Sequence, residues 1–133
     1  MELSPKAWLA VGGVFFLVSL DFFLRMHVSL RACNEGIAFG VSVPKPVIIL
    51  LAIFLIFFFF RNWKDEADHS LAFGYLLLVT GGGLNLLDRI VSGCVRDYLF
   101  LPFLPLFPSF NLADMMLVLG VGVIARAIFR RTS

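Results

Sequence analysis

Four long apolar segments, separated by shorter polar ones, dominate the hydropathy pattern of this chain. A helix that spans a membrane needs roughly 20 consecutive, mostly apolar residues. Four segments meet that length: residues 7–28, 44–60, 70–90 and 110–129. The pattern predicts an all-α membrane protein with four transmembrane helices, forming a single domain over residues 1–133.

Three connections join the predicted helices, and they differ in character. Residues 29–43 are short and polar, and residues 61–69 form a charged hairpin, RNWKDEADH. Residues 91–109 are mostly apolar but contain Pro102, Pro105 and Pro108. Because proline interrupts a continuous helix, we predict a short interfacial loop or helix there, on the outer face of the membrane.

Composition supports a membrane protein and excludes several classes. The 133 residues are 60% hydrophobic and include 16 Phe, whereas soluble domains average about 45–50% apolar residues. A net charge of +2 without a dense basic tract argues against nucleic-acid binding. Two Cys and two His without ligand spacing predict no metal site and no cofactor. The first apolar run is too long for a signal peptide, contains Asp21 and lacks a small-residue cleavage site, so we interpret it as a retained helix.

The orientation follows from the basic residues near the helix ends. An even number of helices places both termini on one side. Lys and Arg divide six against five between the two sides, which is a weak bias. The C-terminal cluster of Arg126, Arg130 and Arg131 favours placing both termini in the cytoplasm.

Several polar and ionisable residues fall near the outer ends of the last two predicted helices. Ionisable groups at membrane depth are costly and usually mark functional sites. They are Asn85, Asp88 and Arg89, then Asp97 in the following loop, then Asn111 and Asp114. Two carboxylates held close together share a proton, so one can activate water while the other protonates a substrate carbonyl. This chemistry is that of an aspartic protease.

Structural explanations compete with this functional one. Asn111 suits a helix N-cap, and Asp114 is an acid in the first turn, although capping alone leaves a carboxylate a full turn into the helix unexplained. Asp88 has the alternative role of neutralising Arg89. Asp21 and Arg25 are four residues apart in the favoured acid-before-base order, so their alternative is a buried pair that satisfies itself.

Two further features concern packing and covalent links. Gly81, Gly82 and Gly83 permit close approach between helices. Cys33 and Cys94 both fall on the predicted outer side. They are either joined in a disulfide or are two small buried apolar side chains.

Four short motifs, in this order on a four-span chain, resemble the lipoprotein signal peptidases (type II signal peptidases) of bacteria. Residues 110–114, FNLAD, match the family's F-N-x-A-D in full, and residues 85–89, NLLDR, match N-x-x-D-R. Residues 93–98, GCVRDY, are similar to G-x-V-V-D-F, with Arg96 and Tyr98 as departures. Residues 34–39, NEGIAF, are similar to N-x-G-A-A-F, with Ile37 departing.

The resemblance implies an intramembrane aspartic endopeptidase of the bacterial inner (cytoplasmic) membrane, with its active site at the outer face. It would remove signal peptides from prolipoproteins that carry a diacylglyceryl cysteine. Membrane lipids and globomycin-type inhibitors would be further partners, and no cofactor or nucleic acid is implied. The family's catalytic pair maps onto Asp97 and Asp114. Its substrate-binding residues map onto Asp21, Asn34, Asn85, Asp88, Arg89 and Asn111.

The chain departs from the family pattern in its first half. The family's first motif is D-Q-x-S/T-K, but here Asp21 is followed by FFLR, so the Gln is missing and Arg25 replaces Lys. Leu84 stands where the family has Gly. The stretch between Asp21 and Asn34 is shorter than in the family, where it forms a small outer β-element that helps to hold substrate. We expect that element to be lost, with more effect on specificity than on chemistry.

Two other functions remain alternatives at this point. Arg96 beside Asp97 and the shortened outer stretch favour a non-catalytic membrane binding or assembly protein that kept the peptidase fold. A small transporter subunit using Asp21 and Arg25 is a third reading, and it leaves the FNLAD match unexplained.

Overall fold

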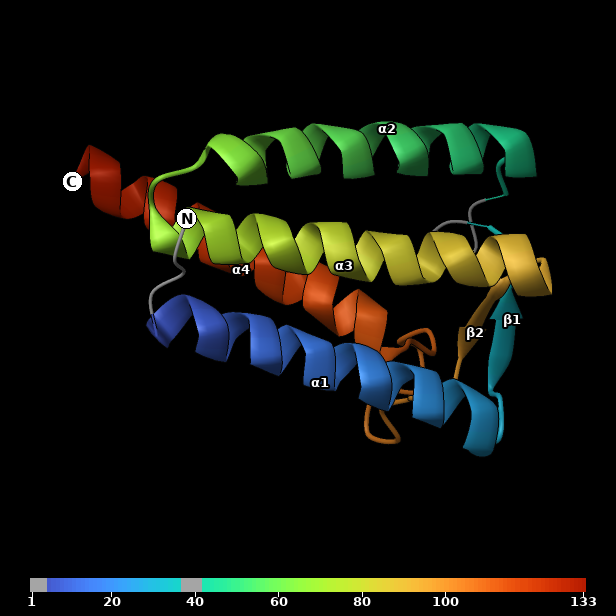
Figure 1. Cartoon of the computed structure of the whole chain (residues 1–133). Coiled ribbons are helices and arrows are strands. Elements are labelled where there is room, and N and C mark those ends of the chain that lie inside the picture. The colour runs from blue at the N-terminus through green and yellow to red at the C-terminus, as the bar shows by residue number, and fades with distance from the viewer. Residues whose placement is uncertain (1–4, 37–41) are drawn as a thin grey trace.

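The computed structural model describes residues 5–36 and 42–133 and contains the four expected helices. They are α1 (Pro5–His27), α2 (Lys45–Asp65), α3 (His69–Ser92) and α4 (Leu112–Thr132). Each is long and apolar enough to cross a membrane. The helices run side by side, and the start of α1 and the end of α4 lie at the same end of the bundle (Figure 1). The prediction of an all-α, four-span membrane protein is confirmed.

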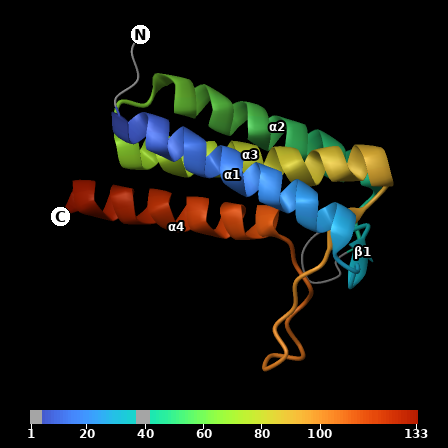
Figure 2. The ribbon, with the colours of Figure 1, turned by 60° about the horizontal axis from the view of Figure 1, so that its bottom comes forward.

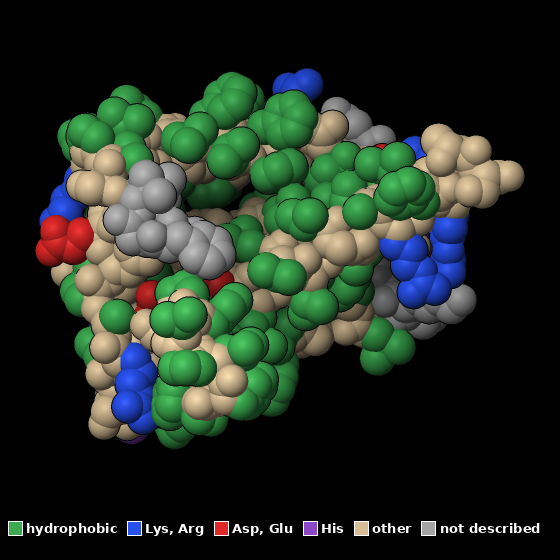
Figure 3. Space-filling view, turned by 180° about the vertical axis from the view of Figure 1, so that it is seen from behind, with side chains coloured by type: hydrophobic (Ala, Val, Ile, Leu, Met, Phe, Trp, Pro, Cys, Tyr) green, Lys and Arg blue, Asp and Glu red, His purple; other side chains and the backbone are tan. Residues whose placement is uncertain are grey.

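Helix α3 is the centre of the bundle. It packs extensively against α4 and α2 and more lightly against α1. Val14, Leu77 and Met116 form a small interior core, while large apolar side chains such as Phe15, Phe54 and Val118 point outward. Hydrophobic side chains cover much of the surface over the helices (Figure 3). An apolar exterior of this extent is expected where lipid rather than water surrounds the helices.

Glycines let α3 and α4 approach closely. A Cβ on Gly81 would lie 2.6 Å from the carbonyl oxygen of Ala113, and one on Gly120 would lie 2.9 Å from that of Gly74. The predicted role is therefore confirmed for Gly81. It is wrong for Gly83, where an added Cβ would meet nothing within 4 Å. The Gly74–Gly120 contact was not predicted, since no motif marks it in the sequence.

Helix α2 is longer than predicted, and the charged hairpin is correspondingly shorter. The helix continues past Phe60 to Asp65, because long polar side chains at a helix end can reach the membrane surface while their backbone stays helical. Asp68 then begins α3 as its N-cap. Its carboxylate accepts hydrogen bonds from the backbone N–H groups of Ser70 and Leu71, at 2.8 and 3.1 Å.

At the other end of the bundle, away from the start of α1 and the end of α4, two short strands form an antiparallel sheet (Figure 1). Strand β1 (Ala32–Asn34) pairs with β2 (Val95–Asp97), and Ala32 lies opposite Asp97. Gly93, with a φ of 79°, ends α3 just before β2. The expectation that this chain lacks an outer β-element is therefore wrong, because three residues on each side suffice to form a minimal one.

A disulfide between Cys33 and Cys94 reinforces this sheet, with 5.5 Å between the two Cα atoms. It resolves the two alternatives for these cysteines in favour of a covalent link. The bond joins β1 to the residue that precedes β2, and so ties the connection after α1 to the strand that carries Asp97.

The segment between β2 and α4 is a loop without a helix. Leu99 pairs with Phe110 at its neck, and turns occupy residues 102–103 and 105–106. The loop projects away from the helices at the end of the bundle where β1 lies (Figure 2). The prediction allowed either a loop or a helix here, and the structure contains a loop. Its position at the membrane interface remains a prediction.

Candidate active site

Two asparagine side chains connect the carboxylates of Asp97 and Asp114. The amide nitrogen of Asn111 donates to Asp97 Oδ1 at 2.9 Å and to Asn85 Oδ1 at 3.2 Å. The amide nitrogen of Asn85 in turn donates to Asp114 Oδ1 at 2.7 Å. The end of β2, the outer part of α3 and the start of α4 thus bring four of the predicted site residues into one hydrogen-bonded chain.

Asn111 and Asp114 also form a capping box that begins α4. Asn111 Oδ1 accepts from the backbone N–H of Asp114 at 2.9 Å, and Asp114 Oδ2 accepts from that of Asn111 at 3.1 Å. The capping role predicted for Asn111 is confirmed. Capping also accounts for one oxygen of Asp114, which the sequence argument did not foresee, and leaves the other oxygen to Asn85.

Asp97 is buried, with 2% of its surface exposed. Burial and the negative charge of Asp114 raise the pKa of Asp97 to about 6, although the hydrogen bond from Asn111 and the positive charges of Arg25 and Arg89 oppose the shift. A carboxyl group with such a pKa keeps its proton in mildly acidic solution. The Asp97 carboxyl can therefore hold a proton close to the charge of Asp114.

A second polar network adjoins these hydrogen bonds and is centred on Arg25. Its Nε contacts Asp21 Oδ2 at 2.6 Å, its Nη2 donates to Asn85 Oδ1 at 3.1 Å, and its Nη1 pairs with Asp88. The predicted Asp21–Arg25 pair is thus present, but it belongs to a larger cluster that reaches the Asn85 side chain.

Asp88 does not neutralise Arg89. Its carboxylate instead pairs with Arg25 and Arg96. That alternative is wrong because consecutive residues on a helix point in different directions, and only residues three or four apart share a face.

Arg89 turns toward the segment after β1. Its Nη2 donates to the carbonyl oxygen of Gly36 at 2.9 Å, and its buried Nε has no hydrogen-bond partner among the described residues. Asn34 Oδ1 accepts from the backbone N–H of Gly36 at 3.0 Å. The rest of the NEGIAF motif, residues 37–39, lies outside the described residues.

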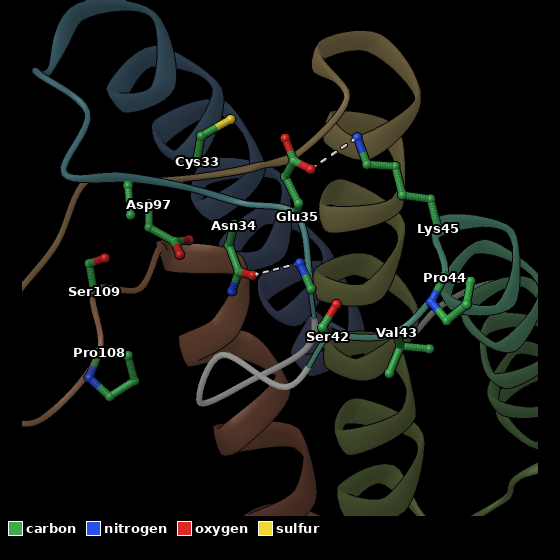
Figure 4. A pocket seen from close by; sticks show the side chains of 12 residues that line it. Cys33, Asn34, Glu35, Ser42, Val43, Pro44, Lys45, Asp97, Pro108 and Ser109 are labelled. Carbon is green, nitrogen blue, oxygen red and sulfur yellow. Dashed lines mark hydrogen bonds and ion pairs between the residues drawn. The ribbon is translucent and has the colours of Figure 1, made fainter.

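A cavity of about 600 Å³ lies beside Asp97 (Figure 4). Pockets of roughly 300–1,000 Å³ are typical of ligand sites. Of the predicted site residues, Asn34 and Asp97 line it, and an ion pair of 3.3 Å between Glu35 and Lys45 borders it. Its walls are residues 32–36, 42–45, 97, 108 and 109.

The remaining predicted residues are mostly enclosed by protein. Asp21, Asn85, Asp88 and Asn111 are buried, and Arg89 and Asp114 are half-buried. Asn111 is hydrogen-bonded to Asn85, and Arg25 contacts Asn85, Asp21 and Asp88. These four buried side chains are therefore placed to support the site rather than to form its surface. No group of three or more His, Cys, Asp or Glu side chains suited to a metal occurs within the described ranges.

Sequence reasoning noted Arg96 and Tyr98 only as departures from a motif. Both contact the buried carboxylates: Arg96 Nε donates to Asp88 Oδ1 and Tyr98 Oη to Asp21 Oδ1, each at 2.7 Å. One signal could have found them. They flank Asp97, and in extended backbone the neighbours of a residue point to the face opposite its own side chain.

Known proteins resemble this chain in sequence and in fold. The sequence pattern of the family described as Signal peptidase (SPase) II matches residues 7–130. The lipoprotein signal peptidase of Helicobacter pylori (strain ATCC 700392 / 26695) is 31% identical, over 93% of this chain and 89% of its own length. That of Brucella ovis is 32% identical, over 84% of this chain and 78% of its own length.

A solved structure shares the fold. It is a bacterial membrane enzyme determined by the in meso method, with a TM-score of 0.77 and 22% identity, over 93% of this chain and 89% of that chain. With four membrane-spanning helices, two aspartates linked through two asparagines at one end, and a family match over nearly its whole length, this chain belongs to the bacterial signal peptidase II family and is a multi-pass membrane peptidase.

Proposed function

We propose that this peptidase is an intramembrane aspartic endopeptidase that removes signal peptides from lipid-modified prolipoproteins. The observation that carries the proposal is the chain of hydrogen bonds from Asp97 through Asn111 and Asn85 to Asp114, beside a cavity that Asp97 lines. The curated relatives are named lipoprotein signal peptidases, which supports the substrate class.

The chemistry follows from two carboxyl groups that share one proton. The ionised carboxylate takes a proton from water, and the oxygen of that water attacks the scissile carbonyl carbon. The protonated carboxyl donates its proton to the carbonyl oxygen, which gives a tetrahedral diol. A proton then passes to the amide nitrogen, the C–N bond breaks, and the diol collapses to the new carboxylic acid.

The environments of the two aspartates suit different parts in this cycle. Asp97 is buried, with a pKa raised to about 6, so it holds the shared proton in mildly acidic solution. Asp114 accepts from two N–H donors, the Asn85 side chain and the Asn111 backbone, which fix the orientation of its carboxylate. Asp97 therefore begins as the acid and Asp114 as the base.

The asparagines orient the pair. Asn111 uses its amide nitrogen on Asp97 and Asn85 and its oxygen on the backbone N–H of Asp114. Asn111 therefore contacts both carboxylates, that of Asp97 through its side chain and that of Asp114 through its backbone N–H, and rotation of either carboxylate breaks a hydrogen bond. Fixing the reacting groups in advance is a large part of enzymatic rate enhancement.

Substrate would enter the cavity beside Asp97. Asn34 on its wall offers an amide group to an extended signal peptide, and Arg89, bound to the Gly36 carbonyl, holds the adjoining segment. The apolar exterior of the bundle would accept the diacylglyceryl chains. Asp21, Asn85, Asp88 and Asn111 support substrate binding from behind, and a globomycin-type inhibitor would occupy the same cavity.

We place the enzyme in the bacterial inner membrane with both termini in the cytoplasm and the active site at the outer face. The start of α1 lies at the same end of the bundle as the last turn of α4, which carries Arg130 and Arg131 (Figure 1). The Cys33–Cys94 disulfide lies at the other end, and disulfides persist in oxidising compartments outside the cytoplasm.

The decisive experiment replaces each aspartate by its isosteric amide. Asp97→Asn and Asp114→Asn should each abolish cleavage of a lipid-modified prolipoprotein in detergent or bilayer, while the purified variants stay folded. Wild-type protein must be assayed on several prolipoproteins, because the short outer segment can narrow the substrate range. A variant that cleaves at nearly the wild-type rate would remove that residue from catalysis.

The non-catalytic alternative makes a different prediction. Arg96 was an argument for it, but the guanidinium of Arg96 binds Asp88, and its charge is already paired there. If wild type cuts no prolipoprotein yet binds a signal peptide or globomycin, the chain is a binding protein that kept the fold.

A further inference from the structure

Arg96 and Tyr98 flank Asp97 in the sequence, and both depart from the family motif. In extended backbone, alternate side chains point to opposite faces. The two flanking side chains therefore point away from Asp97, into the interior behind it. Their contacts there decide how firmly the backbone of Asp97 is held.

Arg96 is fixed to Asp88 by its side chain and its backbone. Its Nε and Nη2 both lie 2.7 Å from Asp88 Oδ1, and its backbone N–H donates to Asp88 Oδ2 at 2.7 Å. Asp88 is itself buried in α3. The residue before Asp97 is therefore attached to the third helix at three nitrogen atoms.

Tyr98 is fixed to two other helices by its hydroxyl group. The hydroxyl donates to Asp21 Oδ1 at 2.7 Å and accepts from the backbone N–H of Leu112 at 3.0 Å. Burial and the hydrogen bond to Asp21 raise the pKa of Tyr98 above its ordinary value, so the hydroxyl keeps its proton at neutral pH. The residue after Asp97 is thus joined to α1 and to the first turn of α4, which carries Asp114.

Arg25 closes these contacts into a ring. It pairs with Asp21, the partner of Tyr98, and with Asp88, the partner of Arg96. Two arginines and two aspartates balance the formal charge of the ring. Arg25 is also a departure from the family, which has Lys at this position. A guanidinium reaches Asp21, Asp88 and Asn85 at once with its planar fork, whereas an ammonium is a point charge.

We infer that Arg96 and Tyr98 are positioning residues that hold the backbone of Asp97 from both sides, through a ring closed by Arg25. The inference rests on the proposed function, in which Asp97 is catalytic. It also explains why three departures from the family motifs occur together: Arg25, Arg96 and Tyr98 all contact the same two buried carboxylates, Asp21 and Asp88.

The test replaces each positioning residue by the one that the family has. Tyr98→Phe removes one oxygen atom, and Arg96→Val removes the guanidinium. Misplacing a catalytic group by about 1 Å can cost about 100-fold in rate, so each variant should lower kcat on a lipid-modified prolipoprotein by about 10-fold. KM should stay within about twofold of wild type, because neither side chain lines the cavity. Arg96→Lys, which keeps the charge but loses the fork, should fall in between.

The double variant tests the ring itself. Residues that act through one network are not independent. Tyr98→Phe combined with Arg96→Val should therefore lose about 20-fold in kcat, whereas independent effects would multiply to about 100-fold. Full multiplication of the two losses would overturn the ring.

Matched controls separate positioning from general damage. Tyr75→Phe removes a tyrosine hydroxyl from a ring stacked on Phe59, and Arg126→Val removes an exposed arginine from α4. Both should keep the wild-type kcat. Asp97→Asn is assayed alongside. If it is inactive while folded Tyr98→Phe and Arg96→Lys keep the wild-type kcat, the inference is overturned and the proposed function stands. If Asp97→Asn remains active, the proposed function fails first.

Discussion

Asn111 and Asp114 bind each other twice at the start of α4, each through its side chain to the backbone N–H of the other. This reciprocal cap begins the helix and at the same time fixes the Asp114 carboxylate so that its second oxygen accepts from Asn85. The motif FNLAD thus encodes a helix start and, by our proposal, a catalytic carboxylate in the same five residues, and a suitable substitution should separate the two roles.

Asn111→Ser should separate capping from catalysis. Serine is nearly as good an N-cap as asparagine, so the thermal midpoint should stay close to that of wild type. Serine cannot reach both Asp97 and Asn85 with an amide nitrogen, so cleavage should fall by about 100-fold, the size of effect expected when reacting groups lose their alignment. Asn111→Ala, which also loses the cap, should cost about 1 kcal/mol in stability as well. Wild-type cleavage by Asn111→Ser would make the asparagine a cap only.

The raised pKa of Asp97 predicts the direction in which activity changes with pH. With an upper pKa of about 6, the aspartate pair loses its shared proton as the pH rises through that value. The kcat/KM of the free enzyme should therefore decline on the alkaline side of about pH 6. A profile measured on a soluble-tagged prolipoprotein between pH 4 and 9 tests this. A flat profile across that range would contradict proton sharing.

The same shift predicts how stability changes with pH. The ordinary pKa of an aspartate is about 3.9, and the folded protein holds the proton up to about pH 6. The folded state therefore binds more protons than the unfolded state between these values, so stability falls as the pH rises from about 4 to about 6 and then levels off. Thermal midpoints in detergent should show this decline for wild type and a weaker one for Asp97→Asn. Equal slopes would show that Asp97 titrates normally.

The four spans could be predicted because membrane thickness fixes the length of an apolar helix, and the order of the four motifs pointed to the aspartate pair. The ring behind the pair could not be predicted in this way. Arg25 and Asp88 are 63 residues apart, and their contact depends on how α1 and α3 are rotated in the bundle. The end of α2 was missed for a simpler reason: hydropathy falls after Phe60, but helical backbone continues into the polar segment.

The contact between α3 and α4 should be sensitive to a single methyl group. Gly81→Ala would place its Cβ 2.6 Å from the carbonyl oxygen of Ala113, and backbone cannot move aside without separating the helices. Because Asn85 and Asp114 lie on these two helices, both the thermal midpoint and cleavage should fall. Gly83→Ala is the matched control, since its Cβ would meet nothing within 4 Å and alanine favours a helix over glycine by up to about 1 kcal/mol. Similar behaviour of the two variants would refute close packing at Gly81.

The disulfide should matter for substrate binding as well as for stability. Removing a disulfide commonly costs about 2–4 kcal/mol, and Cys33 lies on the cavity wall. The double variant Cys33→Ser, Cys94→Ser should lower the thermal midpoint and raise KM more than it lowers kcat, because Asp97 is still held from behind by Arg96 and Tyr98. Reductant should reproduce both effects in wild type and have none on the double variant. Unchanged KM after the thiols are freed would show that the sheet keeps its shape without the bond.

The projecting loop gives the last prediction. Residues 98–113 contain no charged side chain, and Phe103 and Leu106 at the far end of the loop are 74% and 98% exposed. At its base, Arg31 lies 4.0 Å from the ring centroid of Phe100, an arrangement that keeps a cation beside the apolar segment. Side chains this apolar and this exposed should insert into the boundary between headgroups and acyl chains, as apolar interfacial segments do.

The position of the loop can be measured by tryptophan fluorescence. In a protein whose own tryptophans are removed by Trp8→Phe and Trp63→Phe, a Leu106→Trp probe should emit at short wavelength and be quenched by lipids brominated on the acyl chains. A Ser109→Trp probe at the cavity should respond more to an aqueous quencher. If only the aqueous agent quenches the Leu106→Trp probe, the loop lies in water. The depth of the active site in the membrane would then be set by the four helices alone.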